Sequence, residues 1–286
     1  MNKILITGVN GFIGSCLYRN LTNNPINNSL IFTYDTSSPN SNELYKKLIN
    51  NIYDYDIIVH MGAISETNTD NPENVLNNNI LATLDMLTKS KPDCKIIYAS
   101  SASVYGHQSS AVNENSAYEN PSSLYAKSKN LIDTIVKDFL IHKKCIGLRF
   151  FNVCSFDNEE HKKQPSPTFL FQKQLRETKS INLFYNSHNI LRDFIFIDDV
   201  IKIIRFFILD NNIKGSEIFN VGSGKPVSFE NIADALISKE GYGCKTYIDK
   251  PHNLTSNYQT FTMADISKLR TYGYNEYIPC ILEYIQ

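Results

Sequence analysis

Three glycines with a fixed spacing constrain the fold of this chain more than any other feature. They lie in the run Gly8-Val9-Asn10-Gly11-Phe12-Ile13-Gly14, which follows a short apolar segment and opens an amphipathic one. In a strand–turn–helix unit, the first glycine permits a tight turn, the second lets the backbone approach a pyrophosphate, and the third lets helix and strand pack closely. The N-terminus of the helix then offers amides and the positive end of a dipole to phosphates. The run therefore predicts a dinucleotide-binding site at the start of the chain.

Short apolar runs alternate with amphipathic stretches through the first half of the chain. Isoleucine-rich runs flanked by polar turns predict strands at Lys3–Thr7, Leu30–Tyr34, Ile57–His60, Lys95–Ser100 and Cys145–Phe150. Apolar residues at helical spacing predict helices at Gly11–Asn23, Asn74–Lys89 and Ser123–His142. This alternation is typical of an α/β protein with a Rossmann-type doubly wound parallel sheet.

The composition changes after Phe151, which suggests a smaller C-terminal substrate-binding lobe. Residues 153–168 are charged and rich in proline and serine, as loops are, and a helix at Thr168–Thr178 and a strand at Ile181–Tyr185 follow. We expect a dinucleotide-binding Rossmann domain over residues 1–152, with returning segments at about 193–221 and 256–268. Residues 153–192, 222–255 and 269–286 then form the substrate-binding lobe.

An acidic residue ends the second expected strand, about twenty residues after the glycines. The carboxylate of Asp35 can accept hydrogen bonds from the ribose hydroxyls of NAD and would repel the 2′-phosphate of NADP. From Thr36 to Tyr45 there is no lysine or arginine to bind that phosphate. The sequence therefore favours NAD as the cofactor, with NADP as the alternative, and Asp35 as a simple turn residue is the competing interpretation.

A tyrosine and a lysine four residues apart open the helix expected at 123–142. In Tyr125-Ala126-Lys127-Ser128-Lys129 this spacing places Tyr125 and Lys129 on one helical face. An ammonium beside a phenol favours the phenolate, so we expect the pKa of Tyr125 to be lowered from about 10 towards neutrality. Such a phenol can take a proton from a sugar hydroxyl while hydride leaves the carbon for nicotinamide. Ser101, at the end of an upstream strand, is expected to share a hydrogen bond with the same oxygen.

Patches along nearly the whole chain resemble the extended short-chain dehydrogenase/reductase family of sugar-nucleotide epimerases and dehydratases. Besides the glycine run and Tyr125/Lys129, the resemblance rests on Tyr98–Gly106, His60–Ala63, Asn79–Thr83, Arg149–Val153, Arg192–Val200 and Phe219–Gly224. It implies a nucleotide-sugar substrate, an acid/base role for Tyr125 with Ser101 and Lys129, and a set of cofactor contacts. Those contacts would come from Gly8, Asn10, Gly11, Phe12, Ile13, Gly14, Asp35, Thr36, Met61, Gly62, Ala63, Asn79, Tyr125 and Lys129.

Within that family the chain is most similar to the ADP-L-glycero-D-manno-heptose 6-epimerases. The similarity rests on Tyr118–Pro121, Glu160–Lys162, Leu183-Phe184 and Tyr258–Asp265. It implies reversible oxidation at C6 of the heptose, with hydride returned to the other face. A second acid/base would come from His161, Lys162 or Lys163, of which we choose Lys162; a solvated charged loop is the alternative. The implied substrate-binding residues are Ser101, Asn152, His161, Phe184, Arg192 and Tyr258.

Charge and cysteine usage narrow the remaining classes of function. With a formal net charge of −1 and no block of like charges, binding to nucleic acid or to a membrane surface is disfavoured. The six cysteines form no C-x-x-C pair, and the histidines show no metal-ligand spacing, so we expect neither disulfides nor a metal site. No segment has the pattern of a signal peptide or a membrane span, which predicts a cytoplasmic protein. A homo-oligomer is expected by analogy with the family.

Three departures from the family pattern keep other functions open. The stretch between Asp35 and Ile57 is short, so one strand of the sheet is expected to be missing. The basic residue that the family has after the second strand is absent, and Cys154-Ser155-Phe156 replaces the usual loop start. The alternatives are a reductase, a dehydrogenase or a dehydratase of another nucleotide sugar, and, more remotely, a non-catalytic dinucleotide-sensing module. Dehydration is disfavoured because Ala102-Ser103 stands where dehydratases carry Asp-Glu.

Overall fold

The chain folds into two compact units, which are described separately. The computed structural model describes residues 1–35, 41–66, 71–157, 159, 164–251 and 258–286. Unit 1 comprises Met1–Val104, Pro121–Arg149 and Val200–Phe219. Unit 2 comprises Tyr105–Asn120, Phe150–Asp199 and Asn220–Gln286.

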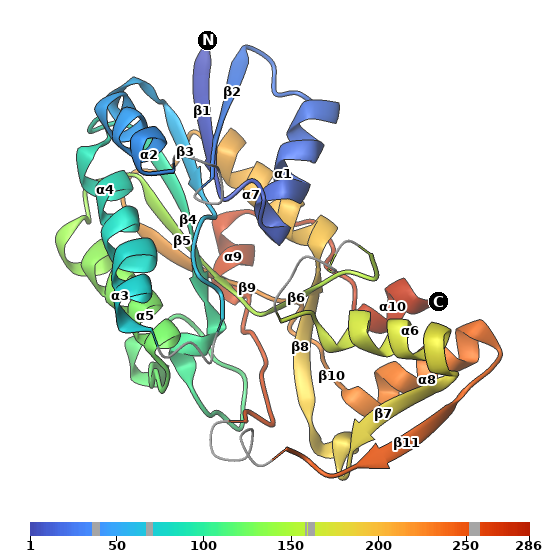
Figure 1. The fold of residues 1–286 in the computed structure, drawn as a ribbon. Coiled ribbons are helices and arrows are strands. Elements are labelled where there is room, and N and C mark those ends of the chain that lie inside the picture. The colour runs from blue at the N-terminus through green and yellow to red at the C-terminus, as the bar shows by residue number, and fades with distance from the viewer. Residues whose placement is uncertain (36–40, 67–70, 158, 160–163, 252–257) are drawn as a thin grey trace. The chain divides into compact units, whose positions relative to one another are not determined.

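Unit 1 is built on a six-stranded sheet with the order β2-β1-β3-β4-β5-β9 (Figure 1). The pairs β1–β2, β1–β3 and β3–β4 are parallel. The Rossmann-type α/β fold predicted from the sequence is confirmed, and each predicted strand agrees to within one residue at either end. The strands are β1 (Asn2–Thr7), β2 (Ser29–Tyr34), β3 (Ile57–His60), β4 (Lys95–Ser101), β5 (Cys145–Phe150) and β9 (Glu217–Val221).

Helices cover both faces of this sheet. The strand order runs from β1 in both directions, and right-handed connections that run in opposite directions place their helices on opposite faces. In Figure 1, α2, α4 and α5 gather on one side of the strands, whereas α1 and α7 lie on the other. A hydrogen bond of 3.1 Å from Arg205 on α7 to Asn20 on α1 joins the latter pair. The helices are α1 (Phe12–Asn23), α2 (Ser41–Asn50), α3 (Pro72–Val75), the π-helix η2 (Leu76–Leu81), α4 (Ala82–Lys89), α5 (Leu124–Phe139) and α7 (Ile197–Leu209).

The short connection between β2 and β3 contains a helix and no further strand among the described residues. Among the described residues, β2 is the edge strand of the sheet, and the next element along the chain is helix α2. A 3₁₀ turn, η1 (Ile52–Asp54), then leads directly into β3, which pairs with β1. Helix α2 packs through Leu48 into the cluster that also holds Met86 and Leu87 of α4. Helix α2, which carries Tyr45 and Leu48, therefore lies beside the core of the sheet near α4.

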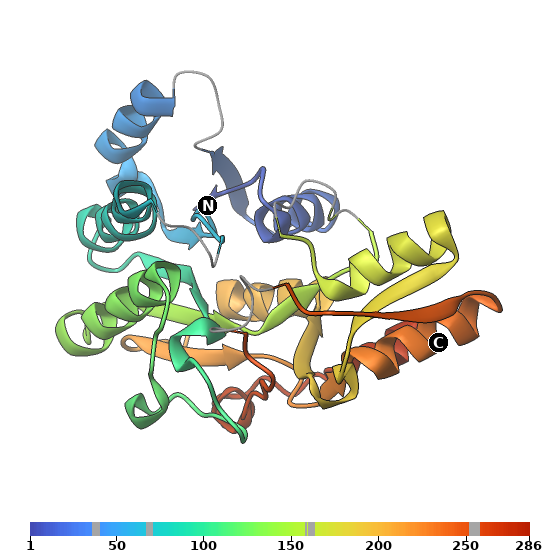
Figure 2. The same ribbon diagram turned by 60° about the horizontal axis from the view of Figure 1, so that its bottom comes forward.

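Unit 2 contains two small sheets and several helices. One sheet has the order β10-β8-β6, with β6 parallel and β10 antiparallel to β8, and the other pairs β7 and β11 in parallel. Figure 2 shows β7 and β11 side by side, with α6 and α8 running along them. The strands are β6 (Asn152–Cys154), β7 (Ser180–Phe184), β8 (Leu191–Phe196), β10 (Pro226–Ser228) and β11 (Cys244–Ile248). The helices are α6 (Pro167–Thr178), α8 (Phe229–Glu240), α9 (Ser267–Tyr272) and α10 (Ile281–Ile285), with short 3₁₀ turns η3 (Ala102–Tyr105), η4 (Ser116–Tyr118) and η5 (Ser187–Asn189) elsewhere in the chain.

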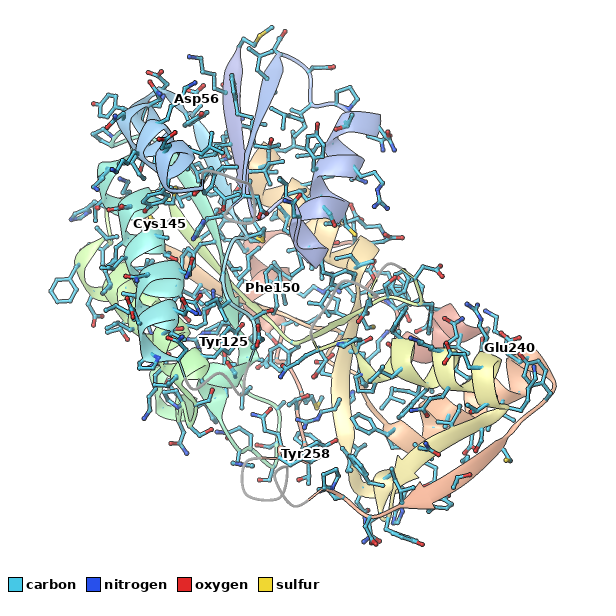
Figure 3. The ribbon with its side chains drawn as sticks, in the orientation of Figure 1. Asp56, Tyr125, Cys145, Phe150, Glu240 and Tyr258 are labelled. Carbon is cyan, nitrogen blue, oxygen red and sulfur yellow. The ribbon has the colours of Figure 1, made fainter. Side chains whose placement is uncertain are left out.

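The local sequence explains where the main helices of both units begin. Ser123 caps α5 by accepting a hydrogen bond from the amide of Ala126 at 3.1 Å, and Ser166 and Ser228 cap α6 and α8 in the same way. Pro167 stands in the first turn of α6, where a missing N–H costs nothing. The Ser123 cap fixes the first turn of α5, which carries Tyr125 (Figure 3).

Candidate active site

The glycine run forms a tight turn between β1 and α1. Gly8 has a φ of +74°, and a Cβ there would lie 2.5 Å from the amide nitrogen of Gly62. A Cβ on Gly14 would lie 2.1 Å from the carbonyl oxygen of Gly8. Gly11 is the N-cap of α1, so the positive end of the helix dipole lies at the turn. No larger residue fits at 8 or 14, which is the close packing that a pyrophosphate-binding turn requires.

A small cavity adjoins this turn on the side of α2 and α4. Its volume is about 100 Å³. The lining comprises Thr7, Gly8, Tyr34, Tyr45, His60, Gly62, Ala63, Ile64, Asn78, Ala82 and Met86. Aromatic rings from β2 and α2 form part of the wall, and the Tyr45 hydroxyl donates a 2.7 Å hydrogen bond to Asp85. Sequence reasoning did not single out Tyr34 or Tyr45.

The acidic residue at the end of β2 reaches the glycine turn. Oδ2 of Asp35 accepts a hydrogen bond of 2.8 Å from the amide of Asn10. The carboxylate is only partly buried, so a ribose hydroxyl can reach its oxygens. Thr36, which we also expected to bind the cofactor, lies outside the described residues. The turn, the carboxylate and the cavity together fit the adenosine-diphosphate half of a dinucleotide.

The segment after β3 closes against the same turn. The amide of Met61 donates to the carbonyl of Thr7 at 3.2 Å, and Gly62 and Ala63 line the cavity. Asn79 is fully buried, and its amide group bonds to both backbone groups of Ile64, at 2.8 Å and 3.0 Å. In this arrangement the Asn79 side chain holds the cavity wall rather than pointing into the cavity.

Tyr125, Lys129 and Ser101 are brought together in unit 1. Ser101 ends β4, while Tyr125 and Lys129 lie on consecutive turns of α5, and all three side chains are buried. The Ser101 side chain lies close enough to the Tyr125 hydroxyl to lower the pKa of that phenol. Nζ of Lys129 lies 5.8 Å from the Tyr125 ring centroid and donates to the carbonyl of Ala99 at 2.8 Å. The predicted juxtaposition of these three residues is therefore present.

The expected direction of the Tyr125 pKa was wrong. Burial raises this pKa above its ordinary value by more than the hydrogen bond from Ser101 lowers it. Lys129 is turned towards the Ala99 carbonyl, and burial lowers its own pKa to about 8 despite the opposing charge of Asp133. Burial thus favours the neutral form of both Tyr125 and Lys129, which lie one helical turn apart.

A buried carboxylate one turn beyond Lys129 was missed by sequence reasoning. Asp133 is fully buried and accepts hydrogen bonds from Tyr98 and Ser100 of β4, each at 2.9 Å. It also accepts one from Nε of Arg149 at 2.8 Å. The available signal was the four-residue spacing from Lys129, which puts Asp133 on the same helical face.

Three of the predicted substrate residues lie together in unit 2. The guanidinium of Arg192 lies 5.4 Å from the ring centroid of Tyr258, and that ring packs edge-on against Phe184 at 6.1 Å. Nζ of Lys250 lies 4.3 Å from the same ring. Burial lowers the pKa of Arg192 and raises that of Tyr258. Figure 3 labels Tyr258, the ring that these contacts share.

Asn152 does not join that cluster. Its amide nitrogen donates to the carbonyl of Asp193 at 2.9 Å and to the hydroxyl of Thr262 at 3.1 Å. Asn152 therefore ties β6 to β8 and to the segment before Ala264.

The loop predicted to hold a second acid/base is only partly described. His161, Lys162 and Lys163 lie outside the described residues. Glu159, beside them, is fully buried and accepts hydrogen bonds from the amides of Ser155 and Ser166 at 2.7 Å and 2.6 Å. It also accepts a hydrogen bond from the hydroxyl of Ser166 at 2.8 Å. This carboxylate therefore anchors both ends of a loop whose composition alone suggested solvated charges.

Two further observations concern only the described part of the chain. No helix there is long and apolar enough to cross a membrane. No three His, Cys, Asp or Glu side chains in the same residues gather closely enough to hold a metal ion.

Comparison with known proteins places these features in context. A family model described as "NAD dependent epimerase/dehydratase family" matches residues 4–222. Among solved structures, the ADP-L-glycero-D-manno-heptose-6-epimerase of Helicobacter pylori is 26% identical, with a TM-score of 0.78 over 93% of this chain and 88% of that one. The UDP-glucuronic acid 4-epimerase of Bacillus cereus, in complex with NAD, is also 26% identical, with a TM-score of 0.76 over 99% and 96%. MoeE5 in complex with UDP-glucuronic acid and NAD has a TM-score of 0.80 at 21% identity, over 99% and 96%, which shows the shared fold.

Proposed function

Because the chain belongs to the NAD dependent epimerase/dehydratase family, we propose that it epimerises ADP-glycero-manno-heptose at C6 with a bound nicotinamide cofactor. The observation that carries the proposal is the grouping of the buried side chains of Tyr125 and Ser101, with Nζ of Lys129 5.8 Å from the Tyr125 ring centroid. This constellation suits proton exchange with a sugar hydroxyl. The similarity to the Helicobacter pylori heptose epimerase supports the choice of sugar.

The cofactor of the proposed reaction is NAD, held by unit 1. The Gly8–Gly14 turn and the start of α1 suit its pyrophosphate, Asp35 its adenosine ribose, and the cavity beside Tyr34 and Tyr45 its adenine. The segment Met61–Ala63 lies along the same path. When bound, NAD supplies a hydride acceptor that can return the hydride to the opposite face of the carbon.

The protein side chains supply the proton chemistry. Tyr125 takes the proton of the reacting hydroxyl and gives it back, and Ser101 orients the phenolic oxygen for both transfers. The carbonyl of Ala99 holds Nζ of Lys129 near the Tyr125 ring. When Lys129 is protonated, its positive charge favours the phenolate form of Tyr125. A second acid/base on the other face of the carbon is assigned to Lys162, with His161 beside it.

The nucleotide sugar is proposed to bind unit 2. Arg192 presents a planar donor fork, which suits the diphosphate, and it is kept in place by Tyr258 and by a 3.2 Å hydrogen bond to Gln259. Phe184 and Tyr258 offer ring faces and edges to a base. Asn152 borders this region through Asp193. Unit 1 is thus proposed as the dinucleotide-binding domain and unit 2 as the substrate-binding domain.

We further propose that the protein is a homo-oligomer. Large apolar side chains remain exposed on η2 and α5, two elements that pack against each other in unit 1. They are Leu76, Leu81, Leu124, Leu131 and Phe139. Exposed large apolar side chains on two neighbouring helices favour a contact surface there. Sedimentation of the wild type and of Leu131→Glu distinguishes a dimer from a monomer.

Incubation with ADP-heptose and NAD, followed by proton NMR at C6, tests the proposed reaction. We expect both C6 epimers to accumulate with no net NADH, and Tyr125→Phe to lose turnover while still binding NAD. UDP-glucuronic acid serves as the comparator, because a UDP-sugar 4-epimerase has the same fold. Inversion of the UDP sugar alone would assign a different substrate, and net NADH would indicate a dehydrogenase.

A further inference from the structure

A continuous chain of buried hydrogen bonds runs through unit 1 from the glycine turn to the catalytic helix. It begins at Thr7, whose Oγ1 lies 2.7 Å from Nδ1 of His60. Nε2 of His60 lies 3.0 Å from the hydroxyl of Thr83, which donates to the carbonyl of Asn79 at 2.7 Å. These four side chains are buried and come from β1, β3, α4 and η2. We call this series, with its continuation below, the Thr7–Tyr125 chain.

The Thr7–Tyr125 chain continues from Asn79 into the helical turn that carries the catalytic tyrosine. Nδ2 of Asn79 lies 3.3 Å from the hydroxyl of Ser128, and Ser128 donates to the carbonyl of Tyr125 at 2.7 Å. The same Asn79 amide holds Ile64, a residue of the cavity wall. At the other end, the amide of Gly62 donates to Thr7 Oγ1 at 3.3 Å. Both ends of the Thr7–Tyr125 chain therefore contact backbone that shapes the candidate active site.

The donors and acceptors assign the proton of His60. The Thr83 hydroxyl has one hydrogen and gives it to the Asn79 carbonyl, so it accepts from Nε2–H of His60. Nδ1 is then unprotonated and accepts from the Thr7 hydroxyl, which itself accepts from Gly62. Only a neutral imidazole with its proton on Nε2 satisfies every bond.

The surroundings of His60 agree with a neutral ring. Burial, and then the charge of Lys129, lower the pKa of His60 to about 3. The groups that contact its two nitrogens, the hydroxyls of Thr7 and Thr83, carry no charge. In a protonated ring Nδ1 would donate to Thr7 Oγ1, and the Thr7 hydroxyl would lose Nδ1 as the acceptor of its own hydrogen.

The helix that carries Asn79 is distorted where the hydrogen bonds of the Thr7–Tyr125 chain cross it. Leu76–Leu81 forms a π-helix between two α-helical segments, and such widened turns are often found at functional sites. A widened turn is less stable than a regular one, so it persists where other bonds compensate. Here the compensating bonds are those of Asn79 to Ile64, to Thr83 and to Ser128.

We propose that the Thr7–Tyr125 chain, with His60 neutral and protonated on Nε2, positions the catalytic turn of α5 relative to the cofactor-binding turn. His60, Thr83, Asn79 and Ser128 are in this view positioning residues that act through Tyr125 and the glycine turn. The proposal rests on the proposed function, because that function gives Tyr125 its catalytic role. It adds a set of residues that determine the catalytic rate without touching the substrate.

Nitrogen-15 NMR of the histidine rings tests the proton assignment on the wild-type protein. We expect one imidazole to show the Nε2–H tautomer with shifts that stay constant from pH 5.5 to 8.5. That resonance should be absent in His60→Gln. An Nδ1–H tautomer, or a ring that titrates in this range, would overturn the proposal. Since this measurement needs no substrate, it decides the assignment even if the wild type turns over no sugar nucleotide.

Isosteric variants of Thr83 test the positioning role. Thr83→Val removes the hydroxyl that joins His60 to Asn79, so we expect kcat to fall at least tenfold while the Kd for NADH changes less than twofold. Thr83→Ser restores the hydroxyl and should restore kcat. Thr88→Val is the matched control, because the Thr88 hydroxyl makes the same bond to a carbonyl four residues earlier but is exposed. Equal kcat values for Thr83→Val and Thr88→Val, or no rescue by serine, would overturn the positioning role.

Discussion

Nε of Arg149 on β5 donates a hydrogen bond of 2.8 Å to Oδ2 of Asp133 on α5, and neither side chain is exposed to solvent. The hydroxyls of Tyr98 and Ser100 on β4 donate to the same carboxylate. Helix α5 is thus tied to two adjacent strands one turn after Lys129 and two turns after Tyr125. A buried ion pair is costly to break because the remaining charge loses its partner.

Replacing Asp133 by asparagine should therefore destabilise the protein strongly. The substitution leaves Arg149 charged and buried, so we expect the free energy of unfolding to fall by about 3 kcal/mol or more. Urea denaturation measures the change. Asp138→Asn, at an exposed position of the same helix, is the control and should change the free energy by less than about 0.5 kcal/mol. Similar values for the two variants would mean that the pair contributes nothing.

Much of the fold could be predicted from periodicity and glycine spacing. The five strands from Lys3 to Phe150 and the start of α5 follow from apolar runs and from the Ser123 cap, since these signals are local. The helix predicted at Asn74–Lys89 is instead interrupted by the π-helix at Leu76–Leu81. That interruption depends on the tertiary bonds of Asn79, which no local pattern contains.

The electrostatics of the site could not be predicted in the same way. Spacing placed Tyr125 and Lys129 together, but the direction of the Tyr125 pKa depends on burial and on where Nζ of Lys129 points. Asp133 and Glu159 read as ordinary charged residues in the sequence, although both are fully buried. Burial of the Asp133 carboxylate depends on a partner on another element, Arg149 of β5, and burial of Glu159 depends on the loop path that brings Ser166 back to it.

Asp35 should set the preference between NAD and NADP. Its carboxylate lies at the glycine turn, where it repels a 2′-phosphate, so we expect NAD to bind more tightly than NADP. In Asp35→Ser the ratio of the two affinities should fall at least tenfold. Titrations of NADH and NADPH fluorescence measure both constants. Asp54→Ser, an exposed position, should leave the ratio unchanged, and a wild type that prefers NADPH would contradict the assignment.

Tyr45 should contribute to adenine binding through its ring. Tyr45→Ala removes part of the cavity wall and should weaken NADH binding about three- to tenfold, in line with the value of an aromatic contact. Tyr45→Phe is the control, because it keeps the ring and loses only the hydrogen bond to Asp85. Nicotinamide mononucleotide lacks adenine, so its affinity should be the same in all three proteins. A loss that is equal for both ligands would place the adenine elsewhere.

Arg192 should affect substrate binding more than turnover. Arg192→Lys keeps the charge but loses the planar fork and its packing on Tyr258, so we expect KM to rise about tenfold and kcat to change less than twofold. Steady-state kinetics with the nucleotide sugar separate the two constants. Arg176→Lys, an exposed position on α6, is the matched control. A fall in kcat without a change in KM would place Arg192 at the reacting carbon instead.

Lys129 should make the stability of the protein depend on pH in the alkaline range. Its pKa is lowered from 10.5 to about 8 by burial, so between these values the unfolded chain binds more protons than the folded one. Stability therefore rises with pH through this window, by about 3 kcal/mol for a shift of this size. The free energy of unfolding of the wild type minus that of Lys129→Met should increase between pH 7.5 and 10, when other alkaline groups cancel in the difference. Lys127→Met, at an exposed position of the same helix, should give a difference that changes far less. A wild-type advantage that stays constant or shrinks across the window would mean that Lys129 remains fully charged beside Tyr125.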